Sequence, residues 1–533
     1  MAFKKFLNKF FIFFILSTIF INSLTPSYGI CSKDFHYIKN SKKPEYLYVI
    51  DQNNMTSAEN VMISTLQGLV SNYSTSQIYT LNSSEPDYAI WLEDLKNNYA
   101  VKYEVVKDPW ELLDKFKSYV DGYILYSNKT KNDPSINNAC SLASLKKSLV
   151  VEESLEDKVK SYGITKLQGD CRNTDKYWAY NNLWNSGLNH SIVIQLSPDK
   201  SAPLRDYAIM AKCLVFFEET SEDLPLSNKV FSSMDKNSIC LGWGSDEYNN
   251  VMTASKHGVS LVAADWSYNL TVLSGFPSMP LNQKESPSPL TEDDVHYVTF
   301  IMSDGDNQQW NLGNNFSSQK WYDSPHKGSF NMGWSITPSM YYLSPTVLNL
   351  YYKNANKDYF IVSPSGNGYM FPSKFPNITL DYFVKNLNDY MGKVDQKYVA
   401  IIDDNAFLKV SIWDKYTKEC NIKGLFYLNY KKHNDYCGEI IWSNDKPVVS
   451  CRDILWDGLE DEDMLVAEIN KRIDLGYTDI HNKNSYSFVY VHAWSKDMNS
   501  IKNVVTKLSK NPKVRIVTPD GFMTLINKNL KKE

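Results

Sequence analysis

Apolar runs of strand length alternate with amphipathic segments along the first half of the chain. Runs at 46–51, 121–127 and 191–196 have the length and composition of buried strands, and the segment ENVMISTLQGLV at 59–70 has the apolar spacing of a helix. Such alternation predicts α/β layering, in which helices cover a sheet. No glycine-rich phosphate loop follows any of these runs, so the pattern gives no indication of nucleotide binding. We expect several small α/β N-terminal domains, at residues 30–135, 136–204 and 205–275.

The second half of the chain continues the alternation after a break rich in proline and serine. Residues 276–294 contain this break and are predicted to be a linker. Further on, Ile501, Val504 and Leu508 share one face of a predicted helix. Strands and helices that alternate in this way predict a β/α barrel or a wide parallel sheet, that is, a β/α-barrel-like C-terminal domain at 295–533. The predicted strands are 298–303, 333–338, 358–364, 398–403, 424–430, 446–451, 486–494 and 514–519.

In a β/α barrel the reactive side chains gather in the loops that follow the strands, at their C-terminal ends. The apolar run at 298–302 leads into Asp304 and Asp306, which are two residues apart, so an extended backbone would point both carboxylates to the same side. Paired carboxylates suit acid, base or nucleophilic catalysis on a glycosidic bond, or the binding of a hard cation. An Asp-Gly turn whose carboxylates cap backbone amides is the structural alternative. Asn307 and Trp310, which follow directly, are candidate substrate ligands.

Further candidates follow the later strands. Asp403 and Asp404 come after the fourth strand and could supply a second catalytic carboxylate, or could cap the helix that follows. Glu439 is another candidate for that role, with an ordinary surface position as the alternative. His492, at the end of the seventh strand, could carry a proton, bind a metal or be structural. Arg452 could bind a substrate acid, hold a carboxylate ionised, or form a structural salt bridge.

Charge and the N-terminus narrow the function classes. Lysines precede an apolar run at 10–21, and small and polar residues follow it, which predicts a secretory signal peptide at 1–29, with an uncleaved anchor as the alternative. No later segment approaches the roughly 20 apolar residues of a membrane helix, so we expect no stable membrane insertion after cleavage, and a secreted or endomembrane-lumen location. The formal net charge is −4 and no basic stripe occurs, which argues against nucleic acid as a partner.

Cysteines and glycosylation sequons fit a secreted chain. The eight cysteines show no CxxC spacing of the kind a zinc site uses, and we expect some of them to form disulfides, including a pair among Cys420, Cys437 and Cys451. The N-x-S/T sequons are consistent with a glycoprotein if the host is eukaryotic. They lie at Asn54, Asn72, Asn82, Asn128, Asn189, Asn269, Asn315 and Asn377.

A loop after the third predicted C-terminal strand combines glycines with aromatic residues. In SPSGNGYMFP, at 363–372, the glycines allow unusual backbone conformations or a close approach to a ligand, and the aromatic side chains offer faces of the kind that a sugar ring prefers. A loop closed by a hydrophobic plug is the structural alternative. The candidate substrate-binding residues of this loop are Gly366, Asn367, Gly368, Tyr369 and Phe371.

The sequence GNGYMFP resembles the GxGYxYP signature of the family of glycoside hydrolase-like proteins that bears this name, with Phe371 in place of the second tyrosine. MSDGDNQQW, GWSITP, KPVVSCRDILW and VHAW resemble its C-terminal domain, and TLQGLV, LRDYAI, LGWGSDE and AADWSYNLTVL resemble its N-terminal half. The resemblance covers essentially the whole mature chain. It implies small α/β N-terminal domains, a β/α-barrel-like domain and a sugar-processing role. Phenylalanine at 371 keeps the ring and removes a hydroxyl, which leaves stacking intact and puts a hydrogen bond in doubt.

Three functions remain open at this point. The first is a secreted glycoside hydrolase that uses two carboxylates, one of them a general acid, with Trp494 of VHAW among the sugar ligands. The second is a non-catalytic carbohydrate-binding or surface protein, because the same aromatic and amide groups bind sugars without cleaving them. The third is a metal-dependent carbohydrate deacetylase or esterase, for which the sequence lacks the usual close pair of histidines. We expect no metal, no cofactor, and a carbohydrate as substrate or ligand.

Overall fold

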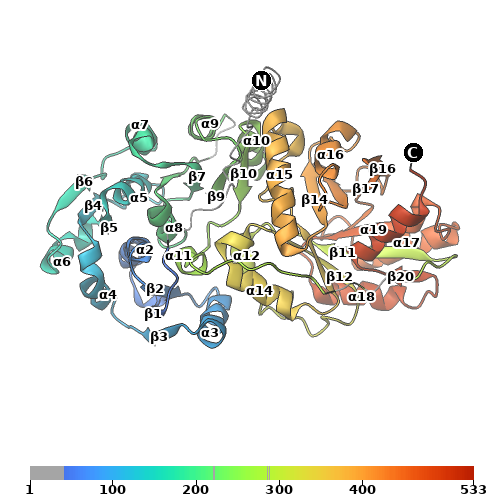
Figure 1. The fold of residues 1–533 in the computed structure, drawn as a ribbon, viewed down its shortest axis with the longest axis horizontal. Coiled ribbons are helices and arrows are strands. Elements are labelled where there is room, and N and C mark those ends of the chain that lie inside the picture. Colours follow the sequence, from blue (N-terminus) through green and yellow to red (C-terminus); the bar gives the residue numbers. More distant parts are fainter. Residues whose placement is uncertain (1–40, 220–222, 285, 287–288, 533) are drawn as a thin grey trace, which may run out of the picture. The chain divides into compact units, whose positions relative to one another are not determined.

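The computed structural model describes residues 41–219, 223–284, 286 and 289–532 (Figure 1). Within these residues the strands form three small sheets followed by one sheet of ten strands. The predicted signal peptide and Cys31 lie outside the described residues. No helix of the described part is long and apolar enough to cross a membrane.

The first two small sheets are parallel and carry helices between their strands. The first has the order β2-β1-β3 and the second the order β5-β4-β6, so β4, which falls in the predicted range 30–135, pairs with the strands that follow it. The strands are β1 (Tyr46–Asp51), β2 (Ser76–Leu81), β3 (Lys102–Val105), β4 (Gly122–Tyr126), β5 (Ser148–Glu152) and β6 (Leu167–Asp170). The helices are α2 (Ser57–Ser71), α3 (Asp87–Tyr99), α4 (Pro109–Phe116), α5 (Ser135–Lys146), α6 (Glu156–Ser161) and α7 (Trp178–Leu183).

The third small sheet is also parallel and has the order β10-β9-β7-β8. Its strand β7 falls in the predicted range 136–204 but pairs with later strands. The elements are β7 (Asn189–Gln195), α8 (Arg205–Ala211), β8 (Cys213–Phe216), α9 (Pro225–Ser232), β9 (Ser238–Gly242), α10 (Glu247–Lys256), β10 (Val259–Val262) and α11 (Leu270–Leu273). The loops after β9 and β10 both reach the site described below.

The C-terminal domain is built on the ten-stranded sheet, which is parallel except for β16. The strands are β11 (His296–Met302), β12 (Met332–Ile336), β13 (Asp358–Val362), β14 (Tyr398–Asp403), β15 (Gly424–Asn429), β16 (Ile440–Ser443), β17 (Lys446–Ser450), β18 (Asp453–Leu455), β19 (Tyr486–Val491) and β20 (Val514–Ile516). The helices are α12 (Gln308–Gly313), α13 (Met340–Leu343), α14 (Pro345–Asn354), α15 (Asn377–Val394), α16 (Val410–Thr417), α17 (Glu462–Asp474), α18 (Met498–Leu508) and α19 (Pro519–Asn529). The predicted strand and helix alternation is confirmed.

The segment from β17 to β18 connects strands near opposite ends of this sheet. β17 pairs with β15, whereas β18, which follows after two residues, pairs with β19 on the far side. The Cys451 N–H donates to the Tyr427 carbonyl oxygen (2.8 Å), and the next N–H, of Arg452, donates to the Phe488 carbonyl oxygen (3.1 Å). The sheet therefore curls back on itself, and the expected β/α-barrel-like architecture is present.

Burial explains why these segments form the barrel. Every residue of β11 is buried, as expected for a parallel strand that is covered on both faces. In α18, Asp497 accepts a hydrogen bond from the Ser500 N–H (2.9 Å) and caps the helix, whose Ile501, Val504 and Leu508 are fully buried. The apolar spacing in the sequence thus identified the packed face of this helix correctly.

The expected disulfide does not form. The seven cysteines of the described ranges are all free. Cys451 belongs to the barrel core, where its Sγ faces the Asp453 carbonyl oxygen, whereas Cys420 lies against Asn388 of α15 and Cys437 is in an exposed loop. Nearness in sequence did not bring these thiols together, because the strands between them carry the chain into different surroundings.

Two of the sequons are buried inside the fold. Asn269 is 1% exposed, and its Oδ1 accepts hydrogen bonds from Gln67 Nε2 (2.9 Å) and the Thr80 N–H (2.8 Å). Asn315 is 2% exposed. A bulky glycan cannot be attached to either side chain in this fold, whereas Asn54 and Asn128 are exposed.

Candidate active site

A tight turn after β11 places Asp304 and Asp306 at the C-terminal end of the strand. Asp304 has a φ of 62°, so the backbone turns at once and does not continue extended as the sequence analysis assumed. The turn needs Gly305, because a Cβ there would lie 1.7 Å from the Ser335 carbonyl oxygen. The Asn307 N–H donates to the Asp304 carbonyl oxygen (2.9 Å). Although the reason differs, both carboxylates do line one cavity.

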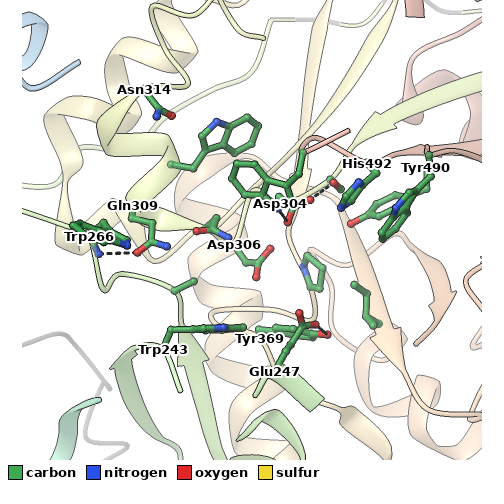
Figure 2. Close-up of a pocket in the computed structure, with 18 of the residues that line it drawn as sticks. Trp243, Glu247, Trp266, Asp304, Asp306, Gln309, Asn314, Tyr369, Tyr490 and His492 are labelled. Carbon is green, nitrogen blue, oxygen red and sulfur yellow. Dashed lines mark hydrogen bonds between the residues drawn. The ribbon is translucent and has the colours of Figure 1, made fainter. Parts of the chain in front are cut away.

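The cavity has a volume of about 630 Å³, within the range usual for ligand sites. Figure 2 shows Asp304 and Asp306 near its centre, with Trp243, Tyr369 and Glu247 along one wall. The small domains contribute Ser84, Glu85, Trp243, Glu247, Ala263 and Trp266. The C-terminal domain contributes Ser303, Asp304, Asp306, Asn307, Gln309, Trp310, Asn314, Pro364, Tyr369, Ile402, Tyr430, His433, Trp456, Tyr490, His492 and Trp494.

Asp304 is held by two hydrogen bonds. Trp494 Nε1 donates to its Oδ1 (2.7 Å), and the Ser303 hydroxyl donates to its Oδ2. Burial raises the pKa of Asp304, while these two donors lower it because they favour the ionised form. With both oxygens engaged, Asp304 keeps its orientation, and its pKa is raised less than that of Asp306, so it is the more readily ionised of the two.

The surroundings of Asp306 favour its protonated form more strongly than those of Asp304 do. Burial raises its pKa well above the usual range, and the charges of Asp304 and Glu247 add to this effect. No side chain of the described residues donates a hydrogen bond that offsets the repulsion. Of the three carboxyl groups, Asp306 is therefore the one that the surroundings favour as a neutral acid.

Glu247 brings a third carboxylate from a different domain. It begins α10, where Asp246 caps the helix by accepting a hydrogen bond from the Asn249 N–H (2.7 Å). The Tyr369 hydroxyl donates to Glu247 Oε1 (3.1 Å). Glu247 stays accessible from the cavity, yet desolvation by the walls raises its pKa, and the Tyr369 hydrogen bond lowers it. Tyr369 and Leu261 of β10 also exchange backbone hydrogen bonds (2.7 and 2.9 Å), which fix the third domain to the barrel loop.

Aromatic rings form much of the remaining wall. Trp494 lies edge-on to Trp310, with ring centroids 5.3 Å apart, and is 49% exposed. Trp243 stacks on Tyr369 at 6.3 Å. Exposed aromatic faces beside carboxylates are suited to an amphipathic ring such as a sugar.

His492 lies at the other end of the cavity from Trp266 and Gln309 (Figure 2). Its ring stacks on Trp456 with centroids 3.5 Å apart, and its Nδ1 is 2.8 Å from the Ser495 hydroxyl. Burial lowers the pKa of His492 to about 4, and the neighbouring His433 adds to the shift. His492 is therefore a neutral part of the wall at physiological pH.

Most residues of the GNGYMFP loop pack in the core beneath the cavity wall and do not line the cavity. Of its predicted substrate ligands only Tyr369 lines the cavity. Gly368 packs against β10, where a Cβ would lie 2.8 Å from the Leu261 carbonyl oxygen. Phe371 is fully buried among the rings of Tyr248, Tyr369 and Tyr430, and Asn367 is 4% exposed. Gly366 packs near Phe383 of α15. Phe371 thus fills the core and offers no face to a ligand.

Asp403 and Asp404 do not line the cavity. Asp403 is fully buried and accepts hydrogen bonds from the Ser373 N–H and hydroxyl (2.6 Å each) and from the Asp404 N–H (2.7 Å). Burial raises the pKa of Asp403 to about 6, although these hydrogen bonds act to lower it. Asp404 accepts from the Tyr248 hydroxyl (2.9 Å). Both have structural partners, but neither caps the helix that follows, α16, whose N-cap is Lys409, so the capping alternative was wrong as well.

Glu439 and Arg452 also lie outside the cavity. Glu439 forms a half-exposed ion pair with Lys483 (2.5 Å). The Arg452 guanidinium donates to the carbonyl oxygens of Tyr486 (3.0 Å) and Gly438 (3.2 Å), so it ties backbone segments together.

The small domains contribute side chains to the site that were not predicted from the sequence. Trp243 and Glu247 follow β9, and Trp266 follows β10, so the strand-end rule used for the barrel would have found them in the third domain as well. Glu85 lies in the loop after β2. Among the described residues, no group of three or more His, Cys, Asp or Glu side chains is placed to hold a metal ion.

Comparisons with known proteins agree with this architecture. Four family models match in succession: "GxGYxYP_N 1st domain" at 46–118, "GxGYxYP_N second domain" at 120–188, "GxGYxYP third domain" at 190–275 and "GxGYxYP putative glycoside hydrolase C-terminal domain" at 294–527. A crystal structure of a "putative hydrolase" from Bacteroides thetaiotaomicron is 33% identical, with a TM-score of 0.85, over 92% of this chain and 96% of that one. A search of curated proteins gave no match. The chain belongs to the GxGYxYP family.

Proposed function

We propose that this protein is a glycoside hydrolase whose catalytic groups are Asp306, Glu247 and Asp304. The observation that carries the proposal is the convergence of three carboxyl groups, from the barrel and from the third small domain, in one cavity with aromatic walls. Acid-assisted cleavage of a glycosidic bond requires a pair of carboxyl groups with different pKa values, one neutral and one ionised.

The surroundings of each group suggest its role. Asp306, which is favoured as the neutral form, donates its proton to the glycosidic oxygen as the bond from that oxygen to the anomeric carbon breaks. Glu247, held toward the ionised form by Tyr369, supplies the carboxylate that attacks the anomeric carbon or takes a proton from the attacking water. Asp304, whose two oxygens are already bonded, stabilises the positive charge that develops on the sugar ring.

The aromatic side chains would bind the sugar. Trp494 is half-exposed at the cavity, and the Trp243 and Tyr369 pair forms a flat wall beside Glu247. The neutral His492 can exchange hydrogen bonds with hydroxyl groups without adding a charge. These contacts suit a ring that has both apolar faces and polar edges.

We also propose that the protein is secreted and acts on carbohydrate outside the cytosol. The apolar run at 10–21, with lysines before it and small residues after it, supports this location. Fractionation of cells that express the full chain would test it, since retention in the cytosol would contradict the proposal.

Release of reducing sugar from a broad glycan panel tests the hydrolase proposal. The purified mature chain should release sugar, and Asp306→Asn should lower the rate by about 10²- to 10⁴-fold, the usual contribution of a general acid. Glu439→Gln is the matched control, because its carboxylate is paired with Lys483 away from the cavity. Equal rates in wild type and Asp306→Asn would refute the assigned role, and glycan binding without any release would favour a sugar-binding protein.

A further inference from the structure

One arm of the cavity contains polar groups that the catalytic roles do not use. Figure 2 shows Asn314, Gln309 and Trp266 on the side of Asp306 that is remote from His492. Glu85 and Trp310 line the cavity as well. Glu85 reaches α12, since a Cβ on Gly313 would lie 1.8 Å from its Oε2. We call the group Glu85, Gln309, Trp310 and Asn314 the Glu85 arm.

Several hydrogen-bonding atoms in and beside this arm have no partner. They include Trp310 Nε1, Asn314 Oδ1 and Asn307 Oδ1, all buried and unpaired among the described residues. Trp310 is only 4% exposed, so bulk water has little access to most of its side chain. A buried polar atom without a partner costs about 1–3 kcal/mol. All three atoms belong to residues that line the cavity, so a ligand that supplies donors and acceptors could satisfy them after small side-chain movements. Sugar hydroxyl groups supply both.

The charge of the cavity limits which sugars fit. Its wall contains four carboxyl groups, Glu85, Asp304, Asp306 and Glu247, and no lysine or arginine among the described lining residues. His492 is neutral at physiological pH. Burial and the nearby Asp87 raise the pKa of Glu85 to about 7, so Glu85 is about half ionised at neutral pH and mostly ionised above about pH 8. Above that pH a further negative charge in this arm would meet repulsion, with no counter-ion among the described lining residues.

We propose that the Glu85 arm is a subsite for a sugar residue without negative charge, and that Glu85 excludes uronic acid and sulfated sugars from it. The sugar nature of the ligand rests on the proposed function. The discrimination rests on the arrangement of carboxyl groups and unpaired polar atoms around the arm.

Calorimetric titration with matched oligosaccharides tests the subsite. At about pH 8.5, where Glu85 is ionised, and in an Asp306→Asn background, which slows turnover, the neutral form of an oligosaccharide should bind at least about tenfold more tightly than its uronic acid counterpart. Adding Glu85→Gln should narrow this preference by about tenfold, because the repelling charge is lost while the shape is kept. Glu111→Gln, an exposed position on α4 outside the cavity, should leave it unchanged.

The possible outcomes separate this inference from the proposed function. Equal or tighter binding of the uronic acid form, an unchanged preference in Glu85→Gln, or no binding of either form would overturn the subsite. Neutral-ligand binding with no turnover by wild type would refute the hydrolase and leave the subsite standing. If Glu85→Gln does not fold, Trp310→Phe provides a second test, since loss of its unpaired N–H should weaken the neutral ligand several-fold and spare a ligand that does not reach the arm.

Discussion

The hydrogen bond between Tyr369 and Glu247 links the family motif to the proposed chemistry, and Tyr369→Phe removes it with little change in shape. The hydroxyl lies 3.1 Å from Glu247 Oε1, and Tyr369 is 4% exposed. The hydroxyl lowers the pKa of Glu247 because it stabilises the carboxylate. Its removal must therefore raise that pKa and make the ionised form scarcer at acid pH.

The structure sets the size of the effect. A hydrogen bond to a charged group contributes about 1.5–3 kcal/mol and one to a neutral group about 0.5–1.5 kcal/mol. Because Glu247 is open to the cavity, the lower values apply, and the ionised form loses about 1 kcal/mol relative to the neutral form. This corresponds to about fivefold less ionised Glu247 at pH values below its pKa, and to no change well above it.

The assay is the pH dependence of kcat/KM on a substrate found in the glycan panel. In Tyr369→Phe the ratio of the value at acid pH to the value at alkaline pH should fall about fivefold relative to wild type. Tyr248→Phe is the control, because the same hydroxyl is lost one residue from Glu247 but its partner is Asp404 (2.9 Å), outside the cavity. An unchanged ratio in Tyr369→Phe, or an equal fall in Tyr248→Phe, would refute the reasoning.

Three further predictions concern residues outside the cavity. Asp403→Ala leaves three donors, two from Ser373 and one from Asp404, without their acceptor, so urea titration should show a loss of about 2–4 kcal/mol in the free energy of unfolding; an unchanged midpoint would contradict this. Thiol labelling of the native protein, mapped by mass spectrometry, should modify Cys420 and Cys437 without prior reduction, whereas a disulfide would protect them. Glu439→Gln should change the free energy of unfolding by less than about 1 kcal/mol in the same titration, because its ion pair with Lys483 is half-exposed. A larger loss would show that this ion pair stabilises the fold, against the prediction.

The sequence was most informative where one rule covered many residues. Parallel strands place their C-terminal ends on one edge, and this rule correctly brought Asp304, Asp306, His492 and Trp494 to one cavity. It could not say which way a side chain turns. Asp403 also ends a strand, but Ser373, thirty residues earlier, supplies donors that draw the carboxylate away from the cavity.

Local pattern could place Glu247 after a strand of the third domain, but it could not show that this strand end meets the barrel. Glu247 and Glu85 reach the site because the small domains pack against the barrel rim, and that packing depends on contacts between residues far apart in the chain, such as Leu261 with Tyr369. The aromatic residues of the family signature also led to a wrong prediction. Phe371 was expected to stack on a sugar, yet it is fully buried between Tyr248 and Tyr430, since a large apolar ring is more stable in the core than at a wet wall.

Chemical rescue of Glu247→Ala tests the central claim most directly, namely that a carboxylate from the third domain completes the site of the barrel. On an aryl glycoside chosen from the panel, this variant should lose turnover, and added azide should restore it by attacking the anomeric carbon while the aryl group departs. The product should be a glycosyl azide. Asp304→Ala should not be rescued, because its role is electrostatic. Wild-type turnover by Glu247→Ala, or rescue of Asp304→Ala in its place, would contradict the account.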